Sequence, residues 1–225
     1  MKTLTVEGLK DFQTCALLHK YRHLDKEKEA IASRDIMGRR FHETMKLVTS
    51  FFFYKKQSGQ VPSYGALLNR WERLWFPKGM DTWDLLIEAQ DVVAGNLASY
   101  TTDAAAGLLR LYEEFSEDDD DPIMINEKFS VPVDKNVKLE GEFDLVLRNS
   151  KTKHFRVVQW TGKRAEKLTP TDWAALKYAF DYRNEGKHAE ATYHAYAFNG
   201  NSPWTLINIE DEDITALKYW IADYD

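Results

Sequence analysis

The stretch EGEFDLVLRN, from Glu140 to Asn149, decides the fold together with FRVVQWTGKR, which runs from Phe155 to Arg164. Both runs are rich in β-branched and aromatic residues, and the polar segment NSKTK that separates them is typical of a hairpin turn. An acid, Asp144, stands within the first run, and Gln159 stands within the second. We expect these two residues to be cross-strand neighbours on one face of a sheet.

The second half of the chain has the period of β-strands, interrupted by single helices. We expect strands over residues 123–133, 137–149 and 154–160, a helix over 169–186 capped by Thr171 or Asp172, strands over 189–200 and 203–210, and a closing helix over 211–224. This order predicts an α/β core with a mixed sheet of about five strands flanked by helices.

The first half of the chain has the period of amphipathic helices. We expect helices over residues 6–24, 33–56 and 64–76, and a long helical stretch from near 81 to 115 with a break around 101–103. The sequence therefore predicts a helical lobe over residues 1–121 and an α/β core over residues 122–225, in one compact domain overall.

An acidic run, SEDDDDP, joins the two halves over residues 116–122. Runs of like charge are commonly solvated, so we expect a solvated connector. A mimic of nucleic acid and a metal-binding tract are the alternatives that this pattern leaves open.

Composition limits the classes of function. The chain has 225 residues and a formal net charge of −6, which argues against binding of nucleic acid by a broad positive surface. A single cysteine, Cys15, cannot form an internal disulfide or a cysteine-rich iron–sulfur site. No apolar run approaches the length of a membrane span, so we expect a cytoplasmic protein that does not contact membranes.

Several short motifs occur in a characteristic order along the chain. MGRRFHETMK holds a G-x-x-x-H pattern at Gly38 and His42; NEKFSVPV carries Glu127; EGEFDLVLR holds a G-x-x-D pattern that ends at Asp144; VVQWTGK and DWAALKYAF follow. Together they resemble the PD-(D/E)XK nuclease superfamily, and specifically its RecB-type exonuclease branch.

The resemblance implies a set of site residues. It assigns metal binding to His42 and Asp144, with magnesium or manganese as the cofactor, and it implies no iron–sulfur cluster because the three further cysteines of cluster-bearing relatives are lacking. The catalytic positions that it implies are Asp144, Gln159, Thr161, Lys163 and Tyr178. A groove that binds nucleic acid would contain Arg39, Arg40, Lys163, Arg164 and Lys167.

Two of the catalytic positions depart from the family pattern. Gln159 stands in place of an acid and Thr161 in place of the motif lysine, although Lys163 could share the strand face and replace that lysine. A neutral amide is a poorer ligand for Mg²⁺ than a carboxylate, so we expect weak metal binding. Glu127 or Glu142 could add a further ligand.

These departures leave three functions open. The first is a degenerate nuclease fold without catalysis, which acts as a nucleic-acid-binding or complex-forming subunit in DNA processing, of a phage or of a repair system, on DNA rather than RNA. The second is an active exonuclease dependent on magnesium or manganese that uses a displaced lysine. The third is a protein-interaction module that does not bind nucleic acid.

Overall fold

A computed structural model describes residues 2–6, 8–9, 33–76, 94–161, 169–184, 190–198 and 203–224. The helix expected over residues 6–24 lies largely outside these ranges, as do Cys15, Lys163, Arg164 and Lys167. Among the described residues, no helix combines the length and the apolar character needed to span a bilayer.

A mixed sheet forms the centre of the described structure. Its six strands are β1 (Lys2–Thr5), β2 (Asp120–Pro132), β3 (Val137–Asn149), β4 (Phe155–Thr161), β5 (Ala191–Ala197) and β6 (Trp204–Ile207). The order is β1-β3-β4-β5-β6, and β2 pairs with β3. β1 runs parallel to β3 and β4 parallel to β5, whereas the other pairs are antiparallel. The predicted α/β fold with a mixed sheet is confirmed, with β1 as a strand that the sequence pattern did not reveal.

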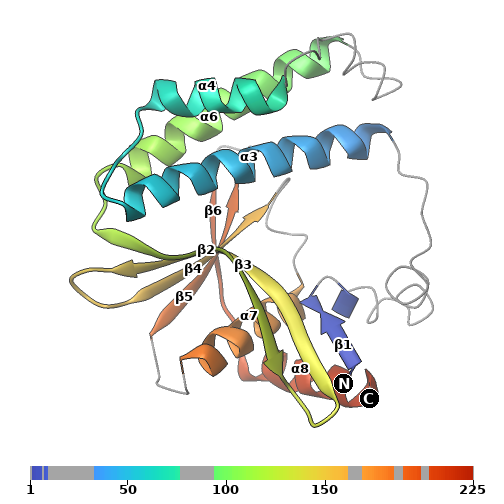
Figure 1. The fold of residues 1–225 in the computed structure, drawn as a ribbon. Helices are drawn as coiled ribbons and strands as arrows, with labels where there is room; N and C mark the ends of the chain where they lie inside the picture. The colour runs from blue at the N-terminus through green and yellow to red at the C-terminus, as the bar shows by residue number, and fades with distance from the viewer. Residues whose placement is uncertain are drawn as a thin grey trace.

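Helices cover both faces of the sheet. On one side lie α3 (Ser33–Gln57), α4 (Tyr64–Trp75) and α6 (Ala94–Phe115), and on the other lie α7 (Pro170–Arg183) and α8 (Asp211–Tyr224) (Figure 1). The side chains of α3, α4 and α6 share one buried cluster with residues of β4 and β5, including Trp160 and Tyr196. Those of α7 and α8 share a second cluster with other residues of β3, β4 and β5.

Strand β3 changes the face that its side chains present, and it does so at Asp144. Phe143 belongs to the cluster on the α7 side and Leu145 to the cluster on the α3 side, although residues two apart share a face in a regular strand. On the paired strand, Asn126 lies between the partners of these two residues and has a φ of 49°. Its amide donates a hydrogen bond to Ser50 Oγ of α3 at 2.6 Å. The irregularity therefore lies directly below α3.

Two local expectations are wrong. Helix α6 continues through residues 101–103, because the buried side chains of Ala104, Leu108 and Leu111 hold this part of the chain against the core. The N-cap of α7 is Thr169 and not Thr171 or Asp172, and it forms a capping box with Asp172.

The acidic run is not a solvated connector throughout. Asp120 begins β2, is buried, and forms an ion pair with Arg156 of β4. Asp118 pairs with Lys56 at the end of α3. These ion pairs join the connector to both halves of the chain, whereas the exposed residues Glu117, Asp119 and Asp121 fit the expectation.

Candidate functional site

Asp144 is the buried acid of the candidate site. Its side chain is 6% exposed, and both carboxylate oxygens have partners. Oδ2 accepts a hydrogen bond from the backbone N–H of Trp160 at 2.8 Å, and Oδ1 contacts the ammonium of Lys46 in an ion pair. Because unpaired charges are rarely tolerated in a protein interior, these two contacts are what allow an acid to stand at this point of β3.

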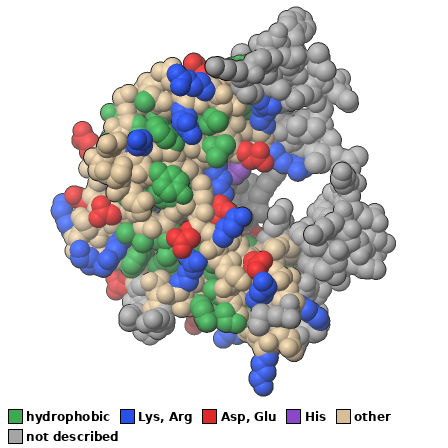
Figure 2. Space-filling model, in the orientation of Figure 1, with side chains coloured by type: hydrophobic (Ala, Val, Ile, Leu, Met, Phe, Trp, Pro, Cys, Tyr) green, Lys and Arg blue, Asp and Glu red, His purple; other side chains and the backbone are tan. Residues whose placement is uncertain are grey.

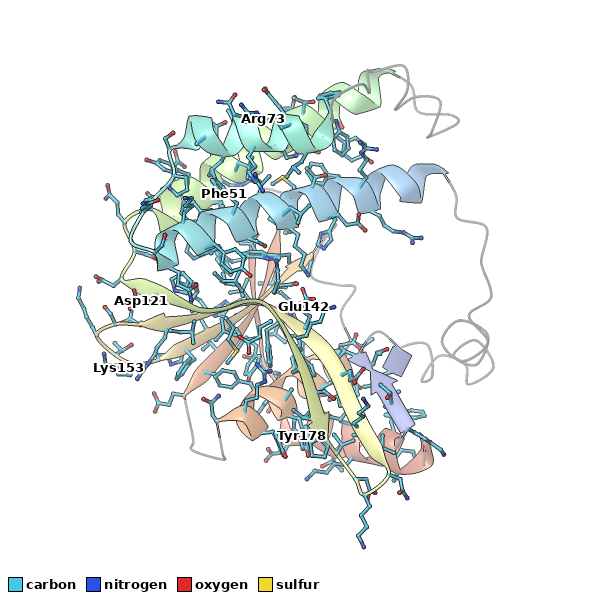
Figure 3. The ribbon with its side chains drawn as sticks, viewed as in Figure 1. Phe51, Arg73, Asp121, Glu142, Lys153 and Tyr178 are labelled. Carbon is cyan, nitrogen blue, oxygen red and sulfur yellow. The ribbon has the colours of Figure 1, made fainter. Side chains whose placement is uncertain are left out.

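Lys46 is a residue of this site that the sequence reasoning missed. It lies on α3 four residues after His42, so both side chains leave the same face of that helix. Its Nζ atom contacts Asp144 and lies 2.8 Å from Glu142 Oε1, so one ammonium bridges two carboxylates of β3. Figure 3 shows Glu142 on the part of β3 that faces α3. A lysine on an amphipathic helix carries no signal that distinguishes it from an ordinary surface residue.

Gln159 and Thr161 make contacts with the backbone of neighbouring strands. The ladder between β3 and β4 ends at the pair Leu145 and Val158, and one further step in the same register places Asp144 opposite Gln159. Gln159 Nε2 donates a hydrogen bond to the carbonyl oxygen of Glu142 at 3.1 Å. Thr161 is buried, and its hydroxyl donates to the carbonyl oxygen of Tyr196 at 3.3 Å.

These two contacts have a structural role. Beyond the last ladder pair, the side chain of Gln159 and the backbone N–H of Trp160 continue the link from β4 to β3. Thr161 links β4 to β5 in the same region. The two residues that the resemblance places at the positions of an acid and a lysine are thus used here to hold three strands together.

His42 lies at the border of the site. Its ring centroid is 6.0 Å from that of Phe198, which follows β5, and its Nδ1 atom is buried without a hydrogen-bond partner among the described residues. Burial lowers the pKa of His42, and the positive charge of Lys46 lowers it further against the opposing effect of Glu43. The imidazole is therefore neutral near pH 7.

The pKa shifts of the ion pair have opposite consequences for charge. Burial raises the pKa of Asp144, against the effects of the Lys46 ammonium and the Trp160 N–H, and this favours the neutral acid. Burial alone lowers the pKa of Lys46, but the two carboxylates outweigh it and raise that pKa, which favours the ammonium. The geometry favours the ionised pair, because a lysine between two carboxylates is stabilised as a cation, and the ammonium in turn stabilises each carboxylate in its ionised form.

Two of the expected site residues lie elsewhere. Tyr178 is on α7, on the other side of the sheet, where its hydroxyl donates to the carbonyl oxygen of Pro132 at 2.9 Å (Figure 3). Glu127, which lies on β2, forms an ion pair with Arg183 of α7. Neither side chain joins Asp144.

Two basic residues of α3, Arg39 and Arg40, differ in their surroundings. Arg39 is exposed, whereas Arg40 donates to the carbonyl oxygen of Trp75 at 3.1 Å and lies 5.6 Å from the centre of the Trp75 ring. Figure 2 shows acidic and basic side chains intermixed over the face in view, without a broad area of one charge. On that face, a nucleic acid would meet isolated cations and not a continuous positive surface.

Comparison with known protein families gives a match. The family model of the PD-(D/E)XK nuclease superfamily matches residues 3–202, a range that contains the whole arrangement around Asp144. A comparison with curated proteins found no match.

Proposed function

The chain belongs to the PD-(D/E)XK nuclease superfamily, and we propose that it uses this scaffold without hydrolysis, as a nucleic-acid-binding or complex-forming subunit in DNA processing. The order of its motifs further supports a place in the RecB-type exonuclease branch. The observation that carries the proposal is the use of Gln159 and Thr161 as links between strands.

The residues present do not fit a divalent ion well. Members of the superfamily typically use magnesium or manganese, which are hard cations that prefer anionic oxygen ligands. Among the described residues, no group of three or more His, Cys, Asp or Glu side chains is close enough to hold a metal. The buried carboxylate of Asp144 already carries an ammonium partner.

Besides the poor fit to a metal, the site lacks a cation at Thr161 that could stabilise the transition state. Hydrolysis of a phosphodiester develops negative charge, and a fixed cation near the scissile phosphate lowers that barrier. Thr161 carries no charge, and its hydroxyl is directed to a backbone carbonyl. A site with a neutral amide and a neutral hydroxyl at these positions supports binding better than catalysis.

The test is an assay for cleavage with Mn²⁺ on single- and double-stranded DNA. We expect the wild type to cleave no faster than Asp144→Ala, the matched control that removes the buried acid. Binding to the same DNA, followed by fluorescence anisotropy, should persist and weaken as salt rises, since phosphate contacts release counterions. Rapid cleavage by the wild type that Asp144→Ala abolishes would show that the proposal is wrong.

A second candidate function is an active nuclease with a displaced lysine. The observation that favours it is Lys46, whose ammonium lies at the buried acid although it comes from α3 and not from β4. In this case the wild type cleaves DNA, and Lys46→Ala removes cleavage while leaving DNA binding in place. The same assay therefore separates the two candidates.

A further inference from the structure

We propose that the Lys46 ammonium takes the place of the divalent cation, so that the chain fills its own metal position. This inference rests on the proposed function, because a nuclease that needs a metal could not keep this position closed. It concerns the three side chains Lys46, Glu142 and Asp144, which join α3 to β3.

The first support is the geometry of the contacts. Glu142 and Asp144 stand two residues apart on β3, and a single atom, Lys46 Nζ, reaches an oxygen of each, at 2.8 Å from Glu142. A cation shared between two carboxylates is also how a hard metal ion is bound. The ammonium thus lies at the position that a metal bridging these two acids would need.

The second support is that both oxygens of Asp144 already have a partner. Oδ2 accepts the N–H of Trp160 at 2.8 Å and Oδ1 contacts Lys46, so a metal that bridges Asp144 and Glu142 would have to displace the ammonium. The displaced ammonium would lose both of its carboxylate partners next to an acid that is only 6% exposed, which makes this exchange unfavourable.

The third support is the way α3 holds the lysine. Its neighbours Met45 and Val48 are fully buried in the cluster between α3 and the sheet, and Thr49 is almost fully buried, so the helix cannot easily move away from β3. Lys46 itself keeps 27% of its side chain exposed, which leaves a route for water and small ions once the ammonium is removed.

The inference predicts that removal of the ammonium creates a metal site. In Lys46→Met the alkyl stem is largely kept but the charge is lost, which leaves two carboxylates facing one gap. We expect this variant to bind Mn²⁺ at least about tenfold more tightly than the wild type, since the charge of the ligand set governs affinity for hard cations. Its melting temperature should rise as Mn²⁺ is added, and that of the wild type should not.

Two control variants make the comparison specific. Lys46→Arg keeps a cation at the site and should bind Mn²⁺ no better than the wild type. Lys46→Met combined with Asp144→Asn removes the main carboxylate and should lose the gained affinity. Titration calorimetry with Mn²⁺ alone, on the full chain, measures all four proteins, and circular dichroism establishes that each is folded.

Two results overturn the inference. One is a folded Lys46→Met that binds Mn²⁺ no better than the wild type, and the other is a gain that survives Asp144→Asn. If Lys46→Met does not fold, Lys46→Gln supplies the same test, because its amide can donate a hydrogen bond to Asp144 without carrying charge. The same gain is expected there, and its absence has the same meaning.

The test of this inference can be told apart from the test of the proposed function. Cleavage by the wild type contradicts the absence of hydrolysis, whereas the Mn²⁺ titration judges the role of the ammonium. If the wild type cleaves DNA and Lys46→Met loses cleavage without gaining Mn²⁺, Lys46 is a displaced catalytic lysine and both proposals are wrong.

Discussion

Replacing Gly107 with alanine tests how closely α6 approaches the end of β5, next to the candidate site. A Cβ atom on Gly107 would lie 2.6 Å from the carbonyl oxygen of Phe198 and 3.3 Å from Cε of Met45. Since ordinary contacts begin near 3.5 Å, helix and strand must separate by about 0.9 Å. Phe198 also packs against His42 and Trp160, so the displacement reaches the site.

The matched control is Gly38→Ala in α3, where a Cβ atom would meet nothing within 4 Å. Alanine stabilises a helix interior by about 1 kcal/mol relative to glycine, and both variants gain this. Overpacking of a close contact costs about 1–3 kcal/mol, and only Gly107→Ala incurs it. We therefore expect Gly38→Ala to be more stable than the wild type, and Gly107→Ala to be less stable than Gly38→Ala by about 1–3 kcal/mol.

Urea unfolding followed by circular dichroism measures the difference. Equal slopes with different midpoints would locate the effect in stability and not in the compactness of the unfolded state. If the two variants have the same midpoint, α6 does not approach Phe198 as closely as the contact of 2.6 Å requires, and the packing argument fails.

The remaining predictions concern charge and repair of the site. Lys46→Met should destabilise the fold by about 3–5 kcal/mol, because it leaves a buried carboxylate without its charged partner. Lys46→Met combined with Asp144→Asn should be less destabilising than the sum of the two single changes. A double-mutant cycle measured by urea unfolding tests both statements. Burial, then the charges of two basic neighbours, lowers the pKa of His194 to about 4, so the unfolded chain takes up this proton first as pH falls. Stability should therefore decline between pH 6.5, the ordinary pKa of this group, and pH 4, and a His194→Gln variant that declines equally would contradict the assignment. In the Lys46→Met background, Gln159→Asp with Thr161→Lys should cleave DNA with Mn²⁺ faster than the background alone, because it restores an acid and an ammonium two residues apart. A folded variant that binds Mn²⁺ without cleaving DNA would show that more than these two positions is missing.

The sequence predicted β3 well, because the signal lies within the strand. Its apolar run and the turns on both sides are local features, and the strand observed is Val137–Asn149 as expected. β1 was missed because four residues form no recognisable period, and its pairing with β3 joins distant parts of the chain. The break expected at residues 101–103 is absent because packing against the core outweighs the weak helix propensity of Thr-Thr-Asp.

Only part of the candidate site could be predicted from the sequence. Asp144 could be recognised because an acid within an apolar strand is unusual. Lys46 could not, because its role depends on how α3 lies across β3 and on the change of face at Asp144. Whether Gln159 and Thr161 serve as links or as substitutes for catalytic groups depends on atoms of neighbouring strands, which no local pattern records.

Because β3 and β4 contribute side chains to both buried clusters, we expect these two strands to resist local unfolding. Residues of these two strands pack against the helices on both sides of the sheet, so their amides can reach solvent only when both layers come apart. Their hydrogen exchange should therefore follow the global unfolding equilibrium, whereas β6, paired on one side only, can exchange by local fraying.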